Sequence, residues 1–373
     1  MEKIKLLHAI SDTNIGGAGV LLLTLLRRLD KEEFAPRVLL PRGAALTERI
    51  LALGVPVTEV AFGADASFRV RDALRLVPAI RAAAPDILHT HGFFSARVAG
   101  RLCGVPKILA TRHCAEPAGR LARLPRAYGI PYSLFTDKTV ATAAYAAEDL
   151  LRRGLAPDKI ALIRNGCEPK RRIADAEKIA LRRRLEIPED AFILGMNARL
   201  ERVKGQDLLL RALVRVRGAG VNAYALFLGC GTQETEYRRL ANELGMAEYT
   251  RFTGFLGDVA PYLNLFDLNL NCSRGTETSC LAISEAMSLG IPTLATDYGG
   301  NPELVRDGCN GYLFKTDDEA ALTDGILRLY RDEKERKKLG DGARRLGNER
   351  FSAENMANMY TKLYKSMLST EKG

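Results

Sequence analysis

The segment IKLLHAISDTNIGGAGVLLLTLLRRL, residues 4–29, decides the fold of the N-terminal half. It begins with an apolar run of strand length at residues 4–9 and continues through a glycine-rich turn at 14–19. A leucine-rich stretch of helical length follows at 20–29. A strand, a glycine turn and a helix in this order form the repeating unit of parallel α/β sheets, so the segment predicts that fold class.

The same rhythm continues along the whole chain, and it predicts helices between short buried strands, for example a helix at 206–217. In the first half, the expected strands are residues 4–9, 37–40, 57–60, 86–90, 107–111, 138–141 and 160–164. In the second half, the expected strands are residues 193–197, 223–228, 250–253, 268–271 and 292–295.

A chain of 373 residues is long enough for two cores, which predicts two domains. A charged, turn-rich segment from 167 to about 190 is interpreted as the linker and the lead-in to the second domain. The final helix is expected to return to the first domain, because its apolar side chains form a seam that must pack. The seam residues are Met356, Met359, Tyr360, Leu363, Tyr364, Met367 and Leu368. The predicted domains are therefore 1–166 with 352–373, and 167–351.

Composition excludes several classes of protein. The longest stretch without a charged residue, 218–233, has 16 residues and four glycines, which is too short and too polar for a membrane span. The N-terminus lacks the apolar core of a secretory signal, so a cytoplasmic protein is expected. The seven cysteines have no metal-site or disulfide-framework spacing. No nucleic-acid-binding module is recognisable.

The positive charge is concentrated in the first half, where residues 1–166 contain 24 Lys and Arg against 15 Asp and Glu. Within residues 117–135, Arg120, Arg123 and Arg126 alternate with apolar side chains. Such a segment can rest on an anionic membrane surface, which would make the protein peripheral on the inner face of the cell membrane. The alternative is a solvated surface, or a contact with phosphates of a substrate.

Two loops that follow strands have the composition of phosphate-binding turns. Gly16 and Gly17 precede a helix, where free N–H groups can meet an anion, although such turns are also common for steric reasons. Arg199 and Lys204, five positions apart, could grip a diphosphate, or could be a solvated basic turn.

The most specific stretch is SRGTETSCLAISEAMSLGIP, residues 273–292. Glu277 lies in the loop after a strand, and Glu285 lies in the following helix. Two such carboxylates can accept hydrogen bonds from sugar and ribose hydroxyls, and the helix N-terminus at 278–281 can meet a phosphate. Taken singly, Glu277 is better explained as a charge at the helix N-terminus, and Glu285 as an ordinary helix residue.

All four histidines, at positions 8, 89, 91 and 113, lie in the first half. His89 and His91 share one face of an extended segment, but no third ligand is evident in the sequence, so no metal site is predicted. His89 is expected to pack within the sheet.

Together these positions resemble glycosyltransferase family 4, the retaining nucleotide-sugar transferases with the GT-B fold. The matching residues are Gly16, Gly17, His113, Asn165, Gly166, Arg199, Lys204, Gly229, Gly231, Glu277 and Glu285. The resemblance covers nearly the whole chain. It implies an N-terminal acceptor domain, a C-terminal donor domain, a cleft between two Rossmann-like domains, and a helix that returns to the first domain.

By this resemblance, Arg199 and Lys204 hold the diphosphate, Glu285 holds the ribose, and Glu277 faces the donor sugar. His113 faces the same sugar from the first domain, and His91 is expected to line the acceptor cleft. The remaining donor-binding positions are Gly16, Gly17, Gly229, Gly231, Gly254, Thr278, Ser279, Cys280 and Leu281.

The reaction implied is hexosyl or hexosaminyl transfer with retention of configuration, without a metal or another cofactor, because Arg, Lys and helix dipoles take the charge of the leaving diphosphate. A UDP-sugar is preferred over GDP-mannose because UDP-sugars are more frequent in the family. The acceptor would be a glycan or a lipid-linked sugar, in cell-surface polysaccharide or glycolipid synthesis.

The sequence departs from the family at Ser279 and Cys280, where an aromatic residue and glycine are usual. Three other functions remain open on the same fold: a nucleotide-sugar epimerase, a phosphorylase, and a non-catalytic regulator that binds a nucleotide-sugar.

Overall fold

The computed structural model describes residues 2–13, 15–63, 68–113, 129, 132–275 and 277–369. The chain divides into two compact units: unit 1 consists of Met1–Gly166 and Ala353–Gly373, and unit 2 of Cys167–Ser352. The return to unit 1 therefore begins one residue after the predicted boundary.

Unit 1 contains a parallel sheet of seven strands in the order β3-β2-β1-β4-β5-β6-β7. Every strand neighbour along this sheet is parallel, as the alternation of strands and helices predicts. The strands are β1 (Ile4–Ile10), β2 (Phe34–Pro41), β3 (Val57–Val60), β4 (Ile87–His91), β5 (Lys107–Arg112), β6 (Lys138–Ala141) and β7 (Ile160–Leu162).

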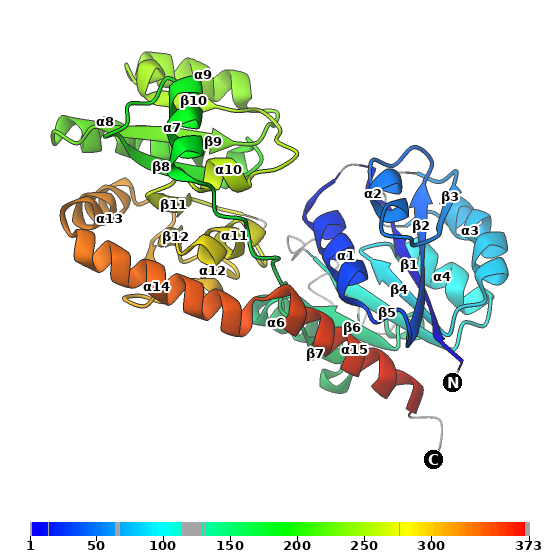
Figure 1. The fold of residues 1–373 in the computed structure, drawn as a ribbon. Coiled ribbons are helices and arrows are strands. Elements are labelled where there is room, and N and C mark those ends of the chain that lie inside the picture. Colours follow the sequence, from blue (N-terminus) through cyan, green and yellow to red (C-terminus); the bar gives the residue numbers. More distant parts are fainter. Residues whose placement is uncertain are drawn as a thin grey trace. The chain divides into compact units, whose positions relative to one another are not determined.

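The helices of unit 1 include the final helix of the chain, α15 (Ala353–Ser369), which packs against α1 (Gly17–Arg28) (Figure 1). The return of this helix is thus confirmed. Its predicted seam holds at Met356, Tyr360, Tyr364 and Met367, which are buried, whereas Met359 is exposed. The other helices are α2 (Thr47–Leu51), α3 (Val70–Ala83), α4 (Phe94–Leu102) and α6 (Ala144–Arg152).

Unit 2 contains a parallel sheet of six strands in the order β10-β9-β8-β11-β12-β13. The strands are β8 (Phe192–Asn197), β9 (Ala223–Leu228), β10 (Thr250–Phe252), β11 (Leu268–Asn271), β12 (Thr293–Thr296) and β13 (Gly311–Phe314). The sequence analysis expected only five. It missed β13 because GYLF is short and follows directly on an Asn-Gly turn signal.

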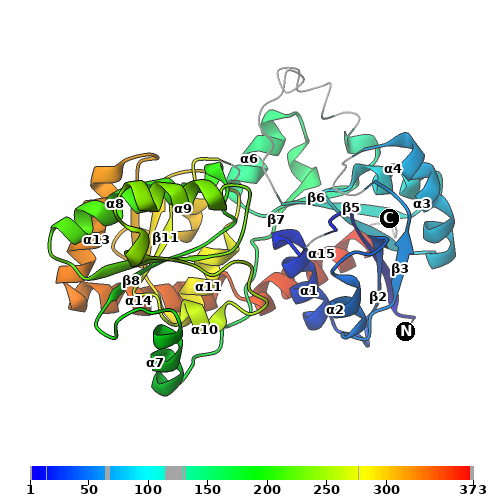
Figure 2. The ribbon, with the colours of Figure 1, turned by 90° about the horizontal axis from the view of Figure 1, so that it is seen from above.

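Helices cover both faces of the unit 2 sheet. Figure 2 shows α8 (Gln206–Gly218) and α9 (Glu234–Glu243) on one face, and α10 (Ala260–Leu263) and α11 (Leu281–Leu289) on the other. The remaining helices are α7 (Asp175–Arg184), α12 (Asn301–Leu304), α13 (Glu319–Arg331) and α14 (Glu333–Arg350).

The charged segment predicted as a linker includes α7 and belongs to unit 2. Leu181 of α7 is buried in an apolar cluster with Ile187 and Phe266, so this segment is part of the packed unit. Among the described residues, no helix combines the length and apolarity needed to cross a membrane.

In each sheet the strand order reverses direction at one point. The reversal lies between β1 and β4 in unit 1, and between β8 and β11 in unit 2. Ligands of open α/β sheets bind beyond the carboxyl ends of the strands at such a switch point. The two switch points are therefore where the functional residues are sought.

Candidate functional site

Two asparagines end the strands at the unit 2 switch point, and each holds one of the predicted carboxylates. Asn197, the last residue of β8, donates from Nδ2 to Glu285 Oε2 at 2.8 Å. Asn271, the last residue of β11, lies with its Nδ2 3.5 Å from Glu277 Oε2. The switch point thus brings both predicted carboxylates to the ends of neighbouring strands.

Glu277 is 6% exposed and is surrounded by hydrogen-bond donors. Its Oε2 accepts from Lys204 Nζ and from Ser273 Oγ, each at 2.8 Å. Its main chain is equally fixed: a Cβ on Gly299, whose φ is +60°, would lie 2.0 Å from the Glu277 carbonyl oxygen. Only glycine allows this approach, so the loop geometry and the ion pair together hold Glu277 in one position.

Glu285 lies within α11 and forms an ion pair with a lysine of the segment that precedes α7 in unit 2. Lys170 Nζ lies 2.8 Å from Glu285 Oε1. Burial opposes the charge of Lys170, but the carboxylate of Glu285 outweighs it, so the pKa of Lys170 is raised. One carboxylate oxygen therefore meets Lys170 and the other meets Asn197.

The side chain of Lys204 is 15% exposed, whereas Arg199 belongs to the exposed residues. Burial opposes the charge of Lys204, yet Glu277 raises its pKa above the ordinary value, and Arg199 acts in the opposite direction. Lys204 therefore remains charged at neutral pH. Gly205 follows in a left-handed conformation, with φ +74°, and a Cβ there would lie 2.2 Å from the Cys272 carbonyl oxygen.

The glycines after β9 serve packing inside the protein. A Cβ on Gly229 would lie 2.5 Å from the Ala198 carbonyl oxygen, and one on Gly231 would lie 2.3 Å from that of Leu200. Gly229 also donates its N–H to the Gly254 carbonyl at 3.0 Å. Gly229 and Gly231 therefore allow close packing against the loop that carries Arg199. The carbonyl of Gly254 accepts a hydrogen bond from Gly229.

The residues at the start of α11 depart from the family pattern without disturbing the helix. Cys280 is the N-cap, with φ −73° and ψ 104°, a conformation open to any residue. Burial, together with the charge of Glu277, raises the pKa of its thiol to about 12. The helix proper begins at Leu281, and its first turn contains no acidic residue. Thr278 is buried, while Ser279 is intermediate.

In unit 1, Gly16 is the N-cap of α1 and Gly17 is its first residue. The first turn of α1 contains no acidic side chain, and the cap makes no side-chain hydrogen bond. A Cβ on Gly16 would meet only Asp12 Oδ2, at 4.0 Å, so this position has open space beside it.

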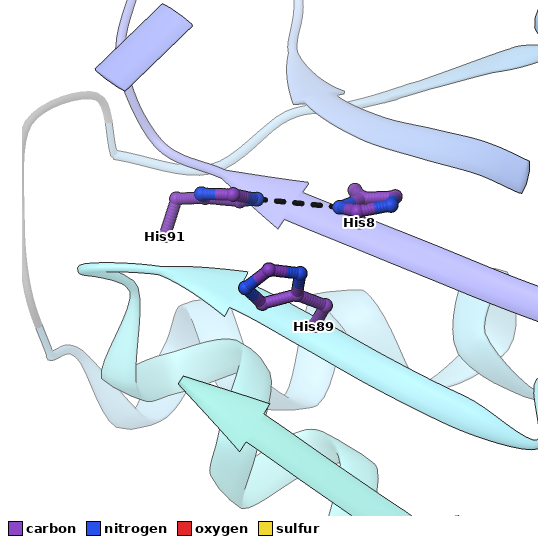
Figure 3. A group of neighbouring side chains, drawn as sticks. All are labelled: His8, His89 and His91. Carbon is purple, nitrogen blue, oxygen red and sulfur yellow. Dashed lines mark hydrogen bonds between the residues drawn. The ribbon is translucent and has the colours of Figure 1, made fainter. Parts of the chain in front are cut away.

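The unit 1 switch point holds a cluster of histidines (Figure 3). His8 on β1 pairs directly with His89 on β4, and His91 lies two residues further on, so the three rings share one face of the sheet. All three are buried. His89 is bonded at both ring nitrogens, to the Tyr364 hydroxyl and to Thr111 Oγ1, each at 2.7 Å.

A hydrogen-bonded line of histidines runs through this cluster. His8 Nδ1 lies 3.3 Å from His91 Nε2 (Figure 3). His91 Nδ1 lies 3.1 Å from His113 Nε2. His91, predicted to line the acceptor cleft, is 5% exposed, and its ring lies between those of His8 and His113. His89 is packed in the sheet as predicted.

A third histidine near His89 and His91 was missed by the sequence analysis. One ring nitrogen from each of His8, His89 and His91 lies within 4.8 Å of the others, a spacing that could hold a metal ion. The missing signal is strand order, since His8 is far away in sequence but adjacent in the sheet. Because both nitrogens of His89 already bond hydroxyls, we interpret the cluster as hydrogen-bonded.

The sequence analysis also missed the residues that support the carboxylates. Each is a polar side chain near a strand end or in the segment that precedes α7, and such a position does not reveal a partner by itself. These residues are Lys170, Asn197, Asn271 and Ser273. The three arginines predicted to meet a membrane, Arg120, Arg123 and Arg126, lie outside the described residues.

Comparisons with known proteins agree with this geometry. The family model described as "Glycosyltransferase Family 4" matches residues 15–171, and that described as "Glycosyl transferases group 1" matches residues 177–346. Among solved structures, the Anabaena protein Alr3699/HepE, in complex with UDP and glucose, has a TM-score of 0.85 at 20% identity. The superposition covers 97% of this chain and 100% of that one. A glycosyltransferase from Rickettsia africae has a TM-score of 0.84 at 19% identity, with full coverage of both chains.

Curated relatives match over shorter stretches. The putative glycosyltransferase EpsD of Bacillus subtilis is 32% identical, over 61% of this chain and 60% of its own length. The N-acetyl-alpha-D-glucosaminyl L-malate synthase of Bacillus anthracis is 29% identical, over 52% of this chain and 50% of its own. The matched stretches thus span only half to three fifths of these two relatives.

The two parallel-sheet units and the returning helix define the GT-B class of α/β proteins. Within that class, the chain belongs to glycosyltransferase family 4, since the two family models account for most of its length.

Proposed function

We propose that this protein transfers a hexosyl or hexosaminyl group from a UDP-sugar to a glycan or lipid-linked acceptor, with retention of configuration. Unit 2 would bind the donor, and unit 1 would recognise the acceptor. The printed names of the relatives and the UDP complexes of Alr3699/HepE support this assignment.

The observation that carries the proposal is the pair of fixed carboxylates at the unit 2 switch point. Glu277 and Glu285 both have oxygen lone pairs left for sugar and ribose hydroxyls, because each carboxylate offers about four acceptor sites. Lys204 has three donors, so it can keep its bond to Glu277 and also donate to a phosphate. Arg199 is exposed beside it and could form a bidentate contact with the same diphosphate.

Thermal shift in the presence of nucleotides tests the donor class. A ligand that binds only the folded state raises stability by about 2.7 kcal/mol at a hundred times its Kd. UDP and UDP-sugars are expected to raise the melting temperature, and GDP and GDP-mannose to leave it unchanged. A rise in melting temperature with GDP-mannose alone would show that the donor is GDP-mannose and not a UDP-sugar.

Product analysis separates transfer from the other functions of this fold. With UDP-sugar and an acceptor glycan, the expected products are UDP and an elongated glycan of retained anomeric configuration, formed at an equal rate after EDTA treatment. Conversion of the sugar without acceptor would indicate an epimerase. Dependence on inorganic phosphate would indicate a phosphorylase, and binding without any product would indicate a regulator.

A peripheral position on an anionic membrane is part of the proposal, and α3 supports it. Phe68, Val70 and Leu74 are 49%, 64% and 61% exposed on this part of unit 1. Arg71 and Arg75 are exposed beside them. Apolar side chains flanked by arginine suit an anionic lipid surface, where each arginine contributes roughly 1 kcal/mol.

Sedimentation with phosphatidylglycerol and phosphatidylcholine vesicles tests this position. Replacing Arg71, Arg75 and Arg81, which are exposed arginines of α3, with Gln is expected to weaken binding to the anionic vesicles at low salt. A second variant, with Gln at Arg120, Arg123 and Arg126, tests the segment that the sequence singled out. The matched control is Gln at Arg183, Arg184 and Arg211, which are exposed in unit 2. Equal binding of all variants to the anionic vesicles, or no binding by the unmodified protein, would refute the proposed membrane association.

A further inference from the structure

Lys170 is a partly buried lysine in the segment of residues 167–174 that precedes α7. Its side chain is 23% exposed, whereas that of the neighbouring Arg171 is 53% exposed. A lysine usually keeps its ammonium group in water, because burial costs free energy unless a partner offsets the loss of hydration. The partner of Lys170 is Glu285, whose side chain is 12% exposed. The chain thus brings a cation out of water to meet this one carboxylate.

The main chain of Lys170 is attached to the same helix as Glu285. Lys170 donates its N–H to Ser288 Oγ at 3.1 Å, and Ser288 Oγ donates to the Glu285 carbonyl at 2.7 Å. Three residues earlier, Cys167 donates its N–H to the Phe351 carbonyl at 2.8 Å, which also ties the segment to unit 2. Lys170 is therefore held next to the turn of α11 that contains Glu285.

Glu285 has one donor on each of its carboxylate oxygens. Lys170 meets Oε1 and Asn197 meets Oε2, each at 2.8 Å. The last torsion of a glutamate side chain has a broad energy profile, so one donor alone does not fix the plane of the carboxylate. Two donors from separate parts of the chain, one on each oxygen, fix that plane.

The carboxylate of Glu285 keeps one free acceptor position on each oxygen, because a carboxylate has about four lone-pair sites. Two hydroxyl groups on adjacent carbon atoms can each donate to one of these oxygens. Ribose has such a pair, the 2′ and 3′ hydroxyls, whereas 2′-deoxyribose has only one of them. A carboxylate with a fixed plane therefore distinguishes the two sugars.

We propose that Lys170 positions Glu285 for the two ribose hydroxyls, and that it thereby makes this site select ribonucleotides over deoxyribonucleotides. Lys170 is a positioning residue, since it acts on the nucleotide only through Glu285. The inference rests on the proposed function, because it takes a nucleoside diphosphate as the ligand of unit 2. The ribose is remote from the reacting bond, so loss of Lys170 should raise KM for the donor and leave kcat nearly unchanged.

Calorimetric titration with UDP and with 2′-deoxy-UDP tests this role. The unmodified protein should bind 2′-deoxy-UDP about 10- to 100-fold more weakly than UDP, the scale for losing a hydrogen bond to a charged group. In Lys170→Met, the ratio of the two dissociation constants should fall to about threefold or less, because Glu285 no longer meets the 2′ hydroxyl in a fixed orientation. An unchanged ratio in the folded variant would refute the positioning role.

The ratio of dissociation constants separates positioning from a merely structural role, because a general loss of stability weakens the binding of both nucleotides alike. Lys178→Met is the matched control and should leave the ratio unchanged, since Lys178 forms its ion pair with the exposed Asp175. Lys170→Arg keeps a cation and should restore most of the ratio. If circular dichroism shows that Lys170→Met does not fold, Lys170→Gln, which keeps a neutral donor, gives the same comparison.

A double-mutant cycle links the effect of Lys170 to Glu285. In a Glu285→Gln background, Lys170→Met should leave the ratio unchanged, because no carboxylate remains to be positioned. A further fall of the ratio in that background would show that Lys170 meets the nucleotide directly, and would overturn the proposal.

Failure of the proposed function gives a different result. If the unmodified protein binds GDP and not UDP, the assigned donor is wrong, and the ratio measured with GDP and 2′-deoxy-GDP decides the role of Lys170. If the protein binds neither nucleotide, the proposed function and the role of Lys170 are both refuted.

Discussion

The two units place polar clusters at equivalent points of similar sheets, yet the clusters differ in charge. In unit 2, the switch point is occupied by partly buried ion pairs, Lys204 with Glu277 and Lys170 with Glu285. In unit 1, it is occupied by neutral histidines and hydroxyl groups. The same topology therefore supports two kinds of site.

The difference follows from what each cluster must stabilise. Buried charges are kept only where partners offset the loss of hydration, as the raised pKa values of both lysines indicate. Such a site is suited to a charged diphosphate. The histidines have lost their charge, as the lowered pKa values indicate, so unit 1 offers directional hydrogen bonds without a strong field. The predictions below test this contrast, beginning with the largest expected effect.

Removing a cation from unit 2 is expected to cost the most activity. Lys204→Ala or Arg199→Ala should raise the activation free energy by about 2 to 4 kcal/mol, the scale for one preorganised donor, or about 30- to 1000-fold in kcat/KM. Steady-state kinetics measure this loss, with Lys338→Ala, an exposed lysine of α14, as control. Near-normal turnover in both variants would refute the diphosphate assignment.

The two variants are expected to differ in stability. Lys204→Ala leaves Glu277 buried without its cation, whereas Arg199 is exposed and its loss leaves no buried charge unpaired. Urea unfolding should therefore show a lower midpoint for Lys204→Ala only. Equal midpoints would mean that the ion pair contributes no net stability.

The two carboxylates of unit 2 are expected to have different roles, one in turnover and one in nucleotide binding. Glu277→Gln should lower kcat by about 30-fold, because a hydrogen bond to a charged group contributes about 1.5 to 3 kcal/mol. Glu285→Gln should weaken UDP binding by about tenfold, or about 1.4 kcal/mol. Calorimetry with UDP and turnover measurements on both variants check this. Loss of UDP binding in Glu277→Gln alone would reverse the two roles.

Mild acid is expected to destabilise unit 1 selectively. A histidine whose pKa is lowered by folding contributes stability above the unfolded pKa of about 6.5, and this stability is lost as the pH falls toward the folded value. At pH 5.5, each buried histidine should cost about 1.3 kcal/mol relative to pH 7. All four histidines lie in unit 1, so unit 2 should be nearly unaffected.

Hydrogen exchange of amides in the two sheets, measured at pH 7 and pH 5.5 and corrected for intrinsic rates, checks this selectivity. Protection should fall in β1 and β4 and persist in β8 and β11. An equal loss in both sheets would show that carboxylates, rather than the histidines, govern the response to acid.

The sequence predicted the positions of strands and helices better than it predicted which of them pair or pack together. Strands such as β3, β6 and β9 were placed at their observed bounds, because β-branched runs flanked by turn residues are a local signal. The strand β13 was missed, because its pairing with β12 contributes what its short sequence does not reveal. Met359 was assigned to the buried seam because helical spacing alone does not locate the edge of a buried face.

The candidate site shows the same limit. Arg199, Lys204, Glu277 and Glu285 were found from motif order, but Lys170 was read as part of a linker. Its ion pair with Glu285 joins positions 115 residues apart, and only the fold brings them together. The histidine line was missed for the same reason, since β1 and β4 are neighbours only through the strand order. Contacts set by topology leave no local pattern in a single sequence.

The smallest expected effect concerns Cys280, where the family usually has glycine. Its backbone does not require glycine, since φ is −73°, and Asn271 Nδ2 lies 3.1 Å from its sulfur. The thiol therefore belongs to the hydrogen-bonded group around Glu277, and its pKa of about 12 keeps it protonated and unreactive.

Cys280→Ala should lower kcat only a few-fold by freeing Asn271, and Cys280→Gly should in addition lose about 0.5 to 1 kcal/mol of stability through backbone entropy. Turnover with UDP-glucose and UDP-N-acetylglucosamine, together with urea unfolding, measures both effects, and alkylation at pH 8 should modify the exposed Cys230 well before Cys280. A large gain with the bulkier donor in either variant would instead show that the sulfur crowds the donor sugar, and would make Cys280 a determinant of donor choice.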